Sequence, residues 1–383
     1  DHLFGRRNVR FKTICSMRIG IFGTRGVPNH HGGFEQFAEM FAPYLVRAGH
    51  EVYVYCSHSH PYQEKQFEGA HLIHCYDPEN RWGTVGQFIY DLNCLLDARG
   101  RDFDIFLQLG YTSSSVWHPL LPKKPVVITN MDGLEWKRAK YNALVRRFLA
   151  SAEKWAVKSS DFLIADNPAI KEYLKEHYQA ESHYIAYGAK AFESPDASDL
   201  EGYGLKPKTY DLIVARMEPE NNIETILDGV VASKTQKLCV VVGKHQATPF
   251  GRYLTEKFKE VSCIRFVGGV YNQGVLDNLR HHASVYFHGH SVGGTNPSLL
   301  EAMGSGVLIA AHNNDFNRHI LGEEALYFKT AEDVAALLDQ ARATQTDQNK
   351  IALNHQKIKT LYHWDLINQQ YLDFFQKAYD AKL

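Results

Sequence analysis

The sequence has no long apolar run and almost no net charge. No stretch of 18 or more apolar residues occurs, so no transmembrane helix is expected. Lys and Arg total 42 against 43 Asp and Glu, so no bulk field attracts nucleic acid. Any anion must therefore be bound by local groups.

Cysteine is scarce and unpatterned. The chain has six cysteines, and no two have CxxC spacing. Cys56, Cys75 and Cys239 lie in apolar runs that are typical of buried strands, where cysteine packs as a small hydrophobe. Reduced thiols of this kind indicate a cytoplasmic protein.

The signature of a dinucleotide cofactor is missing. The loop after the first apolar run, Gly23–Pro28 followed by Gly32 and Gly33, does not have GxGxxG spacing. The next run ends at Ser57 rather than at an acidic residue for a ribose, which argues against NAD. Glycines at a strand-to-helix turn still let backbone N–H groups approach a phosphate, although an unliganded tight turn has the same pattern.

No metal site is expected. Asp102-Phe103-Asp104 imitates a metal-binding DxD, but it directly precedes a buried run and predicts a turn. Three histidine pairs lack a third ligand nearby in the sequence. These pairs are His58/His60, His281/His282 and His288/His290.

Short apolar runs alternate with amphipathic segments in the first half of the chain. This alternation predicts a parallel sheet with helices on both faces, and so an α/β fold. The expected strands are Arg18–Gly23, Glu51–Cys56, His71–Tyr76, Asp104–Leu109, Pro125–Asn130, Asp161–Ala165 and His183–Ala186. The expected helices are Phe34–Arg47, Thr84–Ala98, Tyr141–Lys158 and Pro168–Tyr178.

The alternation stops at residues 191–210, which are rich in Pro, Gly, Ser and Asp and are typical of an interdomain linker. A second series follows, and the tail from Thr330 is helical. The expected strands are Asp211–Ala215, Lys237–Gly243, Ile264–Gly268, Val285–His288 and Val307–Ala311. The expected helices are Asn222–Ala232, Pro249–Glu260, Gln273–His282 and Pro297–Gly304.

These patterns divide the chain into two doubly wound domains, residues 17–190 and 191–360, and a final helix within residues 361–383. Residues 1–16 look unlike a fold element. They carry basic residues but no apolar core, so they make a poor signal peptide, and we treat them as an extension outside the fold.

The most informative motif runs from His290 to Gly304. A strand ends, a glycine-rich loop turns, and a helix begins, with Asn296 as a good N-cap and Pro297 suited to the first helical position. Glu301, just over one turn into an otherwise apolar helix, can accept two hydrogen bonds from a ribose diol. The loop's free N–H groups can face an anion or sugar hydroxyls, and its candidate residues are Gly293, Gly294, Thr295 and Asn296.

At these residues the sequence resembles a known family. The segment at 297–306, PSLLEAMGSG, is similar to the donor-site signature of family 4 retaining glycosyltransferases of the GT-B fold. The likeness extends over nearly all of Met17–Leu383. Matching segments are Gly32-Gly33, Ile185–Gly188 and Ala215–Asn222; Gly23–Glu35 and Asp132–Trp136 are closest to bacterial rhamnosyltransferase-like members of surface polysaccharide synthesis.

The resemblance implies a fold of two Rossmann-like domains that face each other across a cleft, with the nucleotide sugar on the second and the acceptor on the first. Arg216 would neutralise the diphosphate, Gly32 and Gly33 would lie at the donor, and Asp132 would orient the acceptor or act as a catalytic carboxylate. It also implies retention of anomeric configuration, no metal, no cofactor beyond the nucleotide-sugar co-substrate, a glycan or lipid-linked acceptor, and a deoxyhexose donor such as dTDP-rhamnose.

Two departures from the family pattern leave alternatives open. Gly293 stands at the first of two glutamate positions that have seven residues between them, and Asn221 stands where a lysine usually follows the loop arginine. Arg25 and Lys244, each at a strand end, are candidate replacements for the missing cation, although both also fit solvated loop charges. A UDP- or GDP-sugar enzyme and a non-catalytic sugar-nucleotide-binding subunit are the competing functions.

One helix predicts peripheral contact with an anionic membrane. Tyr141–Lys158 has an apolar stripe that suits packing on the sheet and a basic opposite face. An ordinary solvated face is the alternative interpretation. The basic residues in and before the helix are Lys137, Arg138, Lys140, Arg146, Arg147, Lys154 and Lys158.

Overall fold

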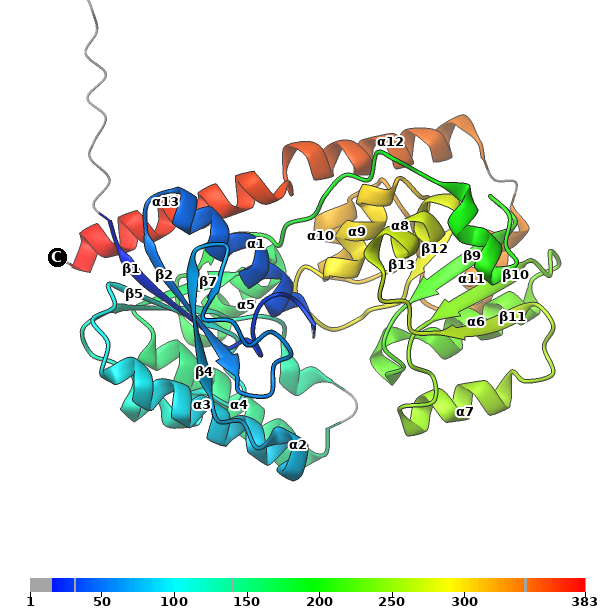
Figure 1. The fold of residues 1–383 in the computed structure, drawn as a ribbon. Helices are drawn as coiled ribbons and strands as arrows, with labels where there is room; N and C mark the ends of the chain where they lie inside the picture. Colours follow the sequence, from blue (N-terminus) through cyan, green and yellow to red (C-terminus); the bar gives the residue numbers. More distant parts are fainter. Residues whose placement is uncertain (1–15, 31, 139–140, 341–342, 383) are drawn as a thin grey trace, which may run out of the picture.

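The computed structural model describes residues 16–30, 32–138, 141–340 and 343–382 of the chain. The predicted N-terminal extension, apart from Ser16, lies outside these residues. Two α/β domains lie side by side, and the C-terminal helices run along both of them (Figure 1). No helix in the described residues is long and apolar enough to cross a membrane.

The first domain is built on one sheet. Its strands are β1 Arg18–Phe22, β2 Glu51–Ser57, β3 Gln66–Phe67, β4 Ala70–Cys75, β5 Ile105–Leu109, β6 Val126–Asn130, β7 Phe162–Ala165 and β8 His183–Tyr184. They are ordered β3-β4-β2-β1-β5-β6-β7-β8, and only β3 pairs antiparallel. β5 and β6 are buried at every position, as expected of central strands covered on both faces.

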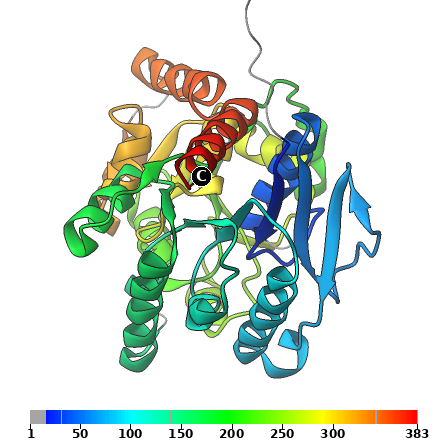
Figure 2. The same cartoon turned by 90° about the vertical axis from the view of Figure 1, so that its left-hand side faces the viewer.

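Helices cover both faces of this sheet (Figure 2). They are α1 Gly33–Arg47, α2 Glu79–Trp82, α3 Thr84–Arg99, α4 Ala143–Ser159 and α5 Pro168–Tyr178. On one face α1 packs Phe37 and Phe41 into the core, and on the other α3 packs Tyr90 and Cys94. α5 begins as its sequence indicates, because the Asn167 side chain caps the helix and a proline follows.

The second domain has a six-stranded parallel sheet, ordered β11-β10-β9-β12-β13-β14. The strands are β9 Tyr210–Val214, β10 Leu238–Val242, β11 Ile264–Gly268, β12 Tyr286–His288, β13 Ile309–His312 and β14 Leu326–Phe328. The helices are α6 Ile223–Ala232, α7 Pro249–Lys257, α8 Gln273–His282, α9 Pro297–Ser305, α10 Asp315–Leu321 and α11 Ala331–Asp339.

Two C-terminal helices link the domains. α12 Gln345–Thr360 packs on α9, and α13 Trp364–Lys382 packs on α1. In the first domain the ring of Tyr371 lies 4.8 Å from that of Phe37, and the Asn130 amide donates to the Tyr371 hydroxyl at 2.9 Å. In Figure 1 α13 is the red helix that lies along the blue helix α1. Its packing attaches the end of the chain to the first domain.

The predicted α/β fold with two parallel-sheet domains is confirmed, and the expected strands and helices end within a few residues of the observed ones. The sequence did not predict the short strands β3 and β14. The predicted linker at residues 191–210 also contains a 3-10 helix, Ala197–Tyr203. Buried Leu200 and contacts with α8 attach this helix to the second domain, so the segment is not a bare linker.

Candidate functional site

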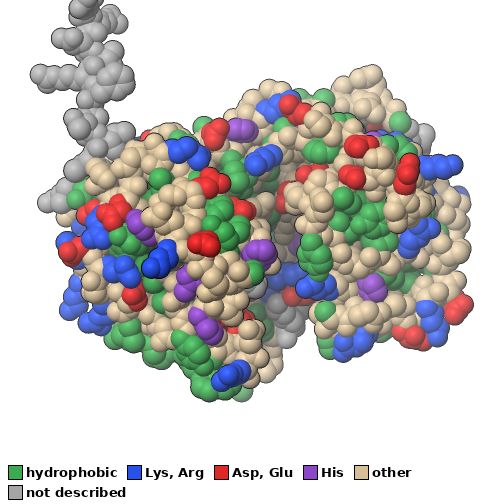
Figure 3. Space-filling model, in the orientation of Figure 1, with side chains coloured by type: hydrophobic (Ala, Val, Ile, Leu, Met, Phe, Trp, Pro, Cys, Tyr) green, Lys and Arg blue, Asp and Glu red, His purple; other side chains and the backbone are tan. Residues whose placement is uncertain are grey.

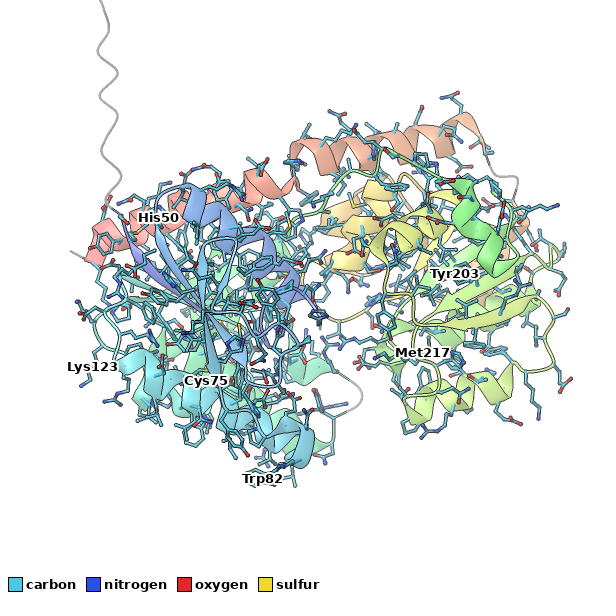
Figure 4. The ribbon with its side chains drawn as sticks, viewed as in Figure 1. His50, Cys75, Trp82, Lys123, Tyr203 and Met217 are labelled. Atoms are coloured by element: carbon cyan, nitrogen blue, oxygen red, sulfur yellow. The ribbon has the colours of Figure 1, made fainter. Side chains whose placement is uncertain are left out.

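Two cavities lie where the domains face each other. The larger, of about 610 Å³, is lined by first-domain residues and by Arg216. The smaller, of about 200 Å³, is lined by both domains. Asp132 and Arg216 line both cavities, so the two spaces meet at these side chains. Figure 3 shows the groove between the two lobes, and Figure 4 places Met217, the neighbour of Arg216, on the second-domain side.

Asp132 lies in a tight turn directly after β6. Its φ of 45° is in the left-handed region, which aspartate tolerates better than most residues. Its backbone N–H donates to Oδ1 of Asn130 at 3.0 Å. A Cβ on the next residue, Gly133, would lie 2.5 Å from the Cα of Gly293. The turn therefore sits directly against the glycine-rich loop of the second domain.

The carboxyl group of Asp132 titrates closer to neutral pH than an ordinary aspartate. Burial raises the pKa of Asp132 to about 6, and the negative charge of Glu135 adds to this. Arg138 and Arg216 lower the pKa by favouring the carboxylate. A carboxyl group that titrates near neutrality can accept or hold a proton, as general acid–base chemistry requires. The catalytic role of Asp132 stays a prediction, now with a location in the cleft.

Arg216 follows β9 and presents a largely exposed side chain. Its side chain is 71% exposed, and its nearest carboxylate is that of Glu218, at 3.9 Å. The neighbouring Asn221 is buried and donates to the carbonyl oxygen of Arg216 at 2.8 Å. Asn221 therefore holds the loop in shape, while Arg216 remains available to an anion.

Two helix N-termini face each other across the smaller cavity. Gly33 begins α1 and Pro297 begins α9, and a Cβ on Gly33 would lie 3.4 Å from Cγ of Pro297. The Asn296 side chain accepts from the N–H of Ser298 at 2.9 Å, so it caps α9 as predicted. The N–H groups of Ser298, Leu299 and Leu300 are already bonded to Asn296, so α9 offers phosphate oxygens its positive dipole rather than free donors. Gly33, Gly293, Gly294, Thr295 and Asn296 all line this cavity.

Three predicted residues lie apart from the smaller cavity. Gly32, the residue before α1, is exposed. Arg25 lines the larger cavity but pairs with Glu79 at 2.8 Å, so its charge is already matched. The Lys244 ammonium lies 5.4 Å from the centre of the Tyr271 ring, and Lys244 lines neither cavity. Lys244 and Arg216 follow adjacent parallel strands, and the role of Lys244 stays a prediction.

Glu301 is also engaged elsewhere. Its Oε2 accepts from the buried guanidinium of Arg280 at 2.6 Å, and Glu301 lines neither cavity. The sequence offered no sign of this partner, which lies on α8. The role of Glu301 in nucleotide binding stays a prediction.

Arg138 belongs to the site, although the sequence assigned it to a basic membrane face. Its guanidinium lies 2.7 Å from Glu135 of its own domain and 3.6 Å from both Glu218 and Glu220 of the second domain. Arg138 thus joins the two domains and lines the smaller cavity. The earlier assignment is wrong because Arg138 points into the cleft, where it neutralises carboxylates from both sides.

The larger cavity is rich in carboxyl and hydroxyl groups. Burial raises the pKa of Asp91 to about 7, and the Ser113 hydroxyl donates to its carboxylate. Asp77 and Glu79 lie on the same wall with Arg25. Such groups hydrogen-bond sugar hydroxyls, whereas they repel anionic ligands.

The metal-like motifs have structural partners. Asp104 accepts from the backbone N–H of Arg18 at 2.7 Å, and Asp102 pairs with Lys124 at 2.9 Å, so both residues fix the turn before β5. The rings of His288 and His290 stack at 4.3 Å. No group of three His, Cys, Asp or Glu side chains that could hold a metal occurs among the residues that the structure describes.

Two parallel-sheet domains that face each other in this way define the GT-B architecture. Solved structures agree. Sucrose-phosphate synthase from Thermosynechococcus elongatus has a TM-score of 0.77 and 16% identity, covering 95% of this chain and 100% of that chain. HepE from Anabaena in complex with UDP-glucose has a TM-score of 0.72 and 12% identity, covering 94% and 100%. WaaG, a glycosyltransferase involved in lipopolysaccharide biosynthesis, has a TM-score of 0.65 and 14% identity, covering 94% and 99%.

These likenesses establish the GT-B fold of the chain, as the resemblance implied. A domain family described as "Domain of unknown function (DUF1972)" matches residues 119–190. That segment includes Asp132, Arg138 and Asp166, so it contains part of the first-domain side of the smaller cavity. Among curated proteins, none matches the sequence.

Proposed function

We propose that the protein is a glycosyltransferase that moves a sugar from a nucleotide diphosphate to a glycan or lipid-linked acceptor in surface polysaccharide synthesis. The observation that carries the proposal is the meeting of Arg216 and Asp132 at the junction of the two cavities. A cation for the leaving diphosphate and a carboxyl group for the acceptor then lie side by side. The resemblance in sequence favours a rhamnosyl donor, with UDP- and GDP-sugars as the alternatives.

The chemistry needs few groups. The acceptor oxygen bonds to the anomeric carbon on the same face from which the diphosphate departs, as retention requires, while the bond from that carbon to the diphosphate breaks. Arg216 and the N-termini of α1 and α9 stabilise the charge that builds on the leaving oxygen, and fixed donors of this kind lower a barrier without reorganising. Asp132 orients the acceptor hydroxyl and accepts its proton. The resembled family retains anomeric configuration, and we propose the same here.

The base and the activity are tested together. We expect one nucleoside diphosphate among dTDP, UDP, GDP and ADP to raise the Tm of the protein, because a ligand that binds only the folded state stabilises it. The matching nucleotide sugar should then be consumed in the presence of a lipid-linked glycan acceptor. A protein that none of the four stabilises would not be a nucleotide-sugar enzyme.

A non-catalytic sugar-nucleotide-binding subunit is the second candidate. It is favoured by Gly293 and Asn221, which supply no carboxylate and no cation where the resembled family has both. Slow hydrolysis of the nucleotide sugar without an acceptor separates the two functions. An enzyme catalyses this side reaction, whereas a binding subunit shows none.

We also propose that the first domain docks on an anionic membrane surface. α3 and α4 lie side by side, with the rings of Phe88 and Phe148 5.7 Å apart. Near the start of these helices Leu144 is 77% exposed and Trp82 is 59% exposed. Hydrophobic side chains gather at this lower end of the domain in Figure 3, where Figure 4 labels Trp82.

Basic residues accompany these apolar ones. Arg147, Lys154 and Lys137 are exposed in and before α4, whereas Arg138 lies in the cleft and Lys140 lies outside the described residues. Apolar side chains together with cations provide the two signals that reversible docking needs. A membrane-bound acceptor would then reach the larger cavity of the same domain.

Replacing Leu144 by glutamate should lower binding to vesicles that contain phosphatidylglycerol about tenfold, because burying a leucine contributes ~1.5–3 kcal/mol. Co-sedimentation measures this, and binding should also fall as salt rises. Leu353→Glu on α12 is the matched control, since Leu353 is exposed on the other domain. Equal binding of both variants and the wild type would rule out docking through α4.

A further inference from the structure

Asp166 holds an unusual position in the cleft. It directly follows β7, as Asp132 follows the neighbouring parallel strand β6, so both carboxyl groups emerge at one edge of the first sheet. Asp166 is only 9% exposed, yet it lines the smaller cavity. The sequence analysis did not single it out.

The second domain lies against both oxygens of the Asp166 carboxyl group but hydrogen-bonds only one of them. The backbone N–H of Thr295 donates to Oδ2 at 3.2 Å, and the Thr295 hydroxyl donates to the Asp166 carbonyl oxygen. Oδ1 is buried and has no hydrogen-bond partner within the described part of the chain. Buried polar atoms are nearly always paired, so an orphan oxygen in a cavity wall indicates a ligand.

The glycine-rich loop is shaped around this oxygen. A Cβ on Gly294 would lie 1.9 Å from Oδ1 of Asp166, so any side chain there would displace the carboxyl group. Gly293 likewise leaves its part of the wall without a side chain. At this part of the smaller cavity the second domain contributes backbone atoms, and the first domain contributes the carboxyl group of Asp166.

Charge decides what the carboxyl group binds. Burial raises the pKa of Asp166 to about 8, with the negative charge of Asp132 as the second cause. At neutral pH this carboxyl group is therefore mostly protonated and uncharged, which suits a sugar hydroxyl, whereas Arg216 on the same cavity wall attracts phosphate. The cavity of about 200 Å³ is smaller than the ~300 Å³ at which pockets for whole ligands begin, so it suits one part of a nucleotide sugar.

We propose that Asp166 recognises the transferred sugar, with Oδ1 hydrogen-bonded to a sugar hydroxyl while Oδ2 stays anchored to Thr295. This rests on the proposed function and adds a specificity residue to it. The donor is then held from both sides: the second domain contacts the diphosphate, and the first domain contacts the sugar. Recognition of the sugar accordingly requires the two domains to be closed on each other.

The test compares each nucleotide sugar with its own nucleoside diphosphate. The probes are dTDP-rhamnose and dTDP, UDP-glucose and UDP, GDP-mannose and GDP, and ADP-glucose and ADP, and calorimetry gives the affinity. For the pair that the wild type binds, Asp166→Ala should weaken the nucleotide sugar about tenfold and leave the nucleoside diphosphate within about twofold, since only the sugar loses a hydrogen bond. Asp228→Ala on α6, away from both cavities, is the control.

A second variant covers the case in which Asp166→Ala fails to fold. Gly294→Ala keeps the carboxyl group but moves it, and it should cause the same selective loss. Equal losses for sugar and diphosphate, or no loss for either, would overturn the assignment while leaving the proposed function intact. If the wild type binds none of the eight probes, the proposed function itself fails, and the assignment fails with it.

Discussion

Replacing Arg216 by alanine should lower turnover about 100- to 1000-fold, because removing one fixed donor from a developing negative charge has an effect of that size. The Tm should stay that of the wild type. The Arg216 side chain is 71% exposed, and Glu218, 3.9 Å away, also has Arg138 at 3.6 Å, so the loss of Arg216 leaves that carboxylate with a cation. Initial rates with saturating acceptor and differential scanning fluorimetry measure the two effects.

The controls separate a diphosphate contact from general loss of positive charge. Arg216→Lys keeps the charge but loses the forked geometry that suits phosphate, so it should recover only part of the rate. Arg252→Ala removes an exposed arginine from α7 of the same domain and should not change turnover. Turnover of Arg216→Ala equal to the wild type would show that another cation does this work, and Arg25→Ala and Lys244→Ala would then be measured.

The strands could be predicted from the sequence because burial on both faces leaves a plain signal. β5 (IFLQL) and β6 (VVITN) are short, mostly apolar runs, and their residues show no helical periodicity. The short strand β3 could not be predicted, since two residues carry no period and β3 exists only through its antiparallel pairing with β4. Local pattern specifies the long elements, and tertiary pairing specifies the short ones.

The residues of the candidate site also fall into those that the sequence pattern could reveal and those that only the tertiary structure reveals. Asp132, Arg216 and the loop at 293–296 could be found because parallel strands bring their carboxyl ends to one edge. Asp166 gave the same signal after β7 and could have been found by the same rule. Arg138 could not, because its partners Glu218 and Glu220 lie on the other domain and become neighbours only when the domains meet.

The contacts between the two domains also affect the charge of the cleft. Arg138 is surrounded by Glu135, Glu218 and Glu220, so it contributes little free positive charge. Under the proposed function, most of the attraction for a diphosphate would then come from Arg216 and the two helix N-termini. That is why Arg216 rather than Arg138 carries the largest predicted loss of activity.

Glu301→Gln should destabilise the protein by about 3 kcal/mol as well as weaken nucleotide binding. Arg280 is 1% exposed and lies 2.6 Å from Glu301, and breaking a buried ion pair from one side leaves a buried charge short of its partner. Asp277, at 3.1 Å, would remain as a counter-ion, which keeps the loss at the lower end of the usual ~3–5 kcal/mol. Chemical denaturation gives the free energy of unfolding.

A double-mutant cycle separates the two roles of Glu301. Arg280→Met removes the cation but keeps Glu301, so it should lose stability while keeping nucleotide affinity. The double variant Arg280→Met/Glu301→Gln should be more stable than the sum of the two losses predicts, because the stranded charge is gone. Its nucleotide affinity should remain ~10- to 100-fold below that of the wild type, which is the loss expected when a charged hydrogen-bond acceptor is removed from a ribose. If calorimetry finds wild-type affinity in Glu301→Gln, then Glu301 serves only as the counter-ion of Arg280, and the ribose must be bound by other groups.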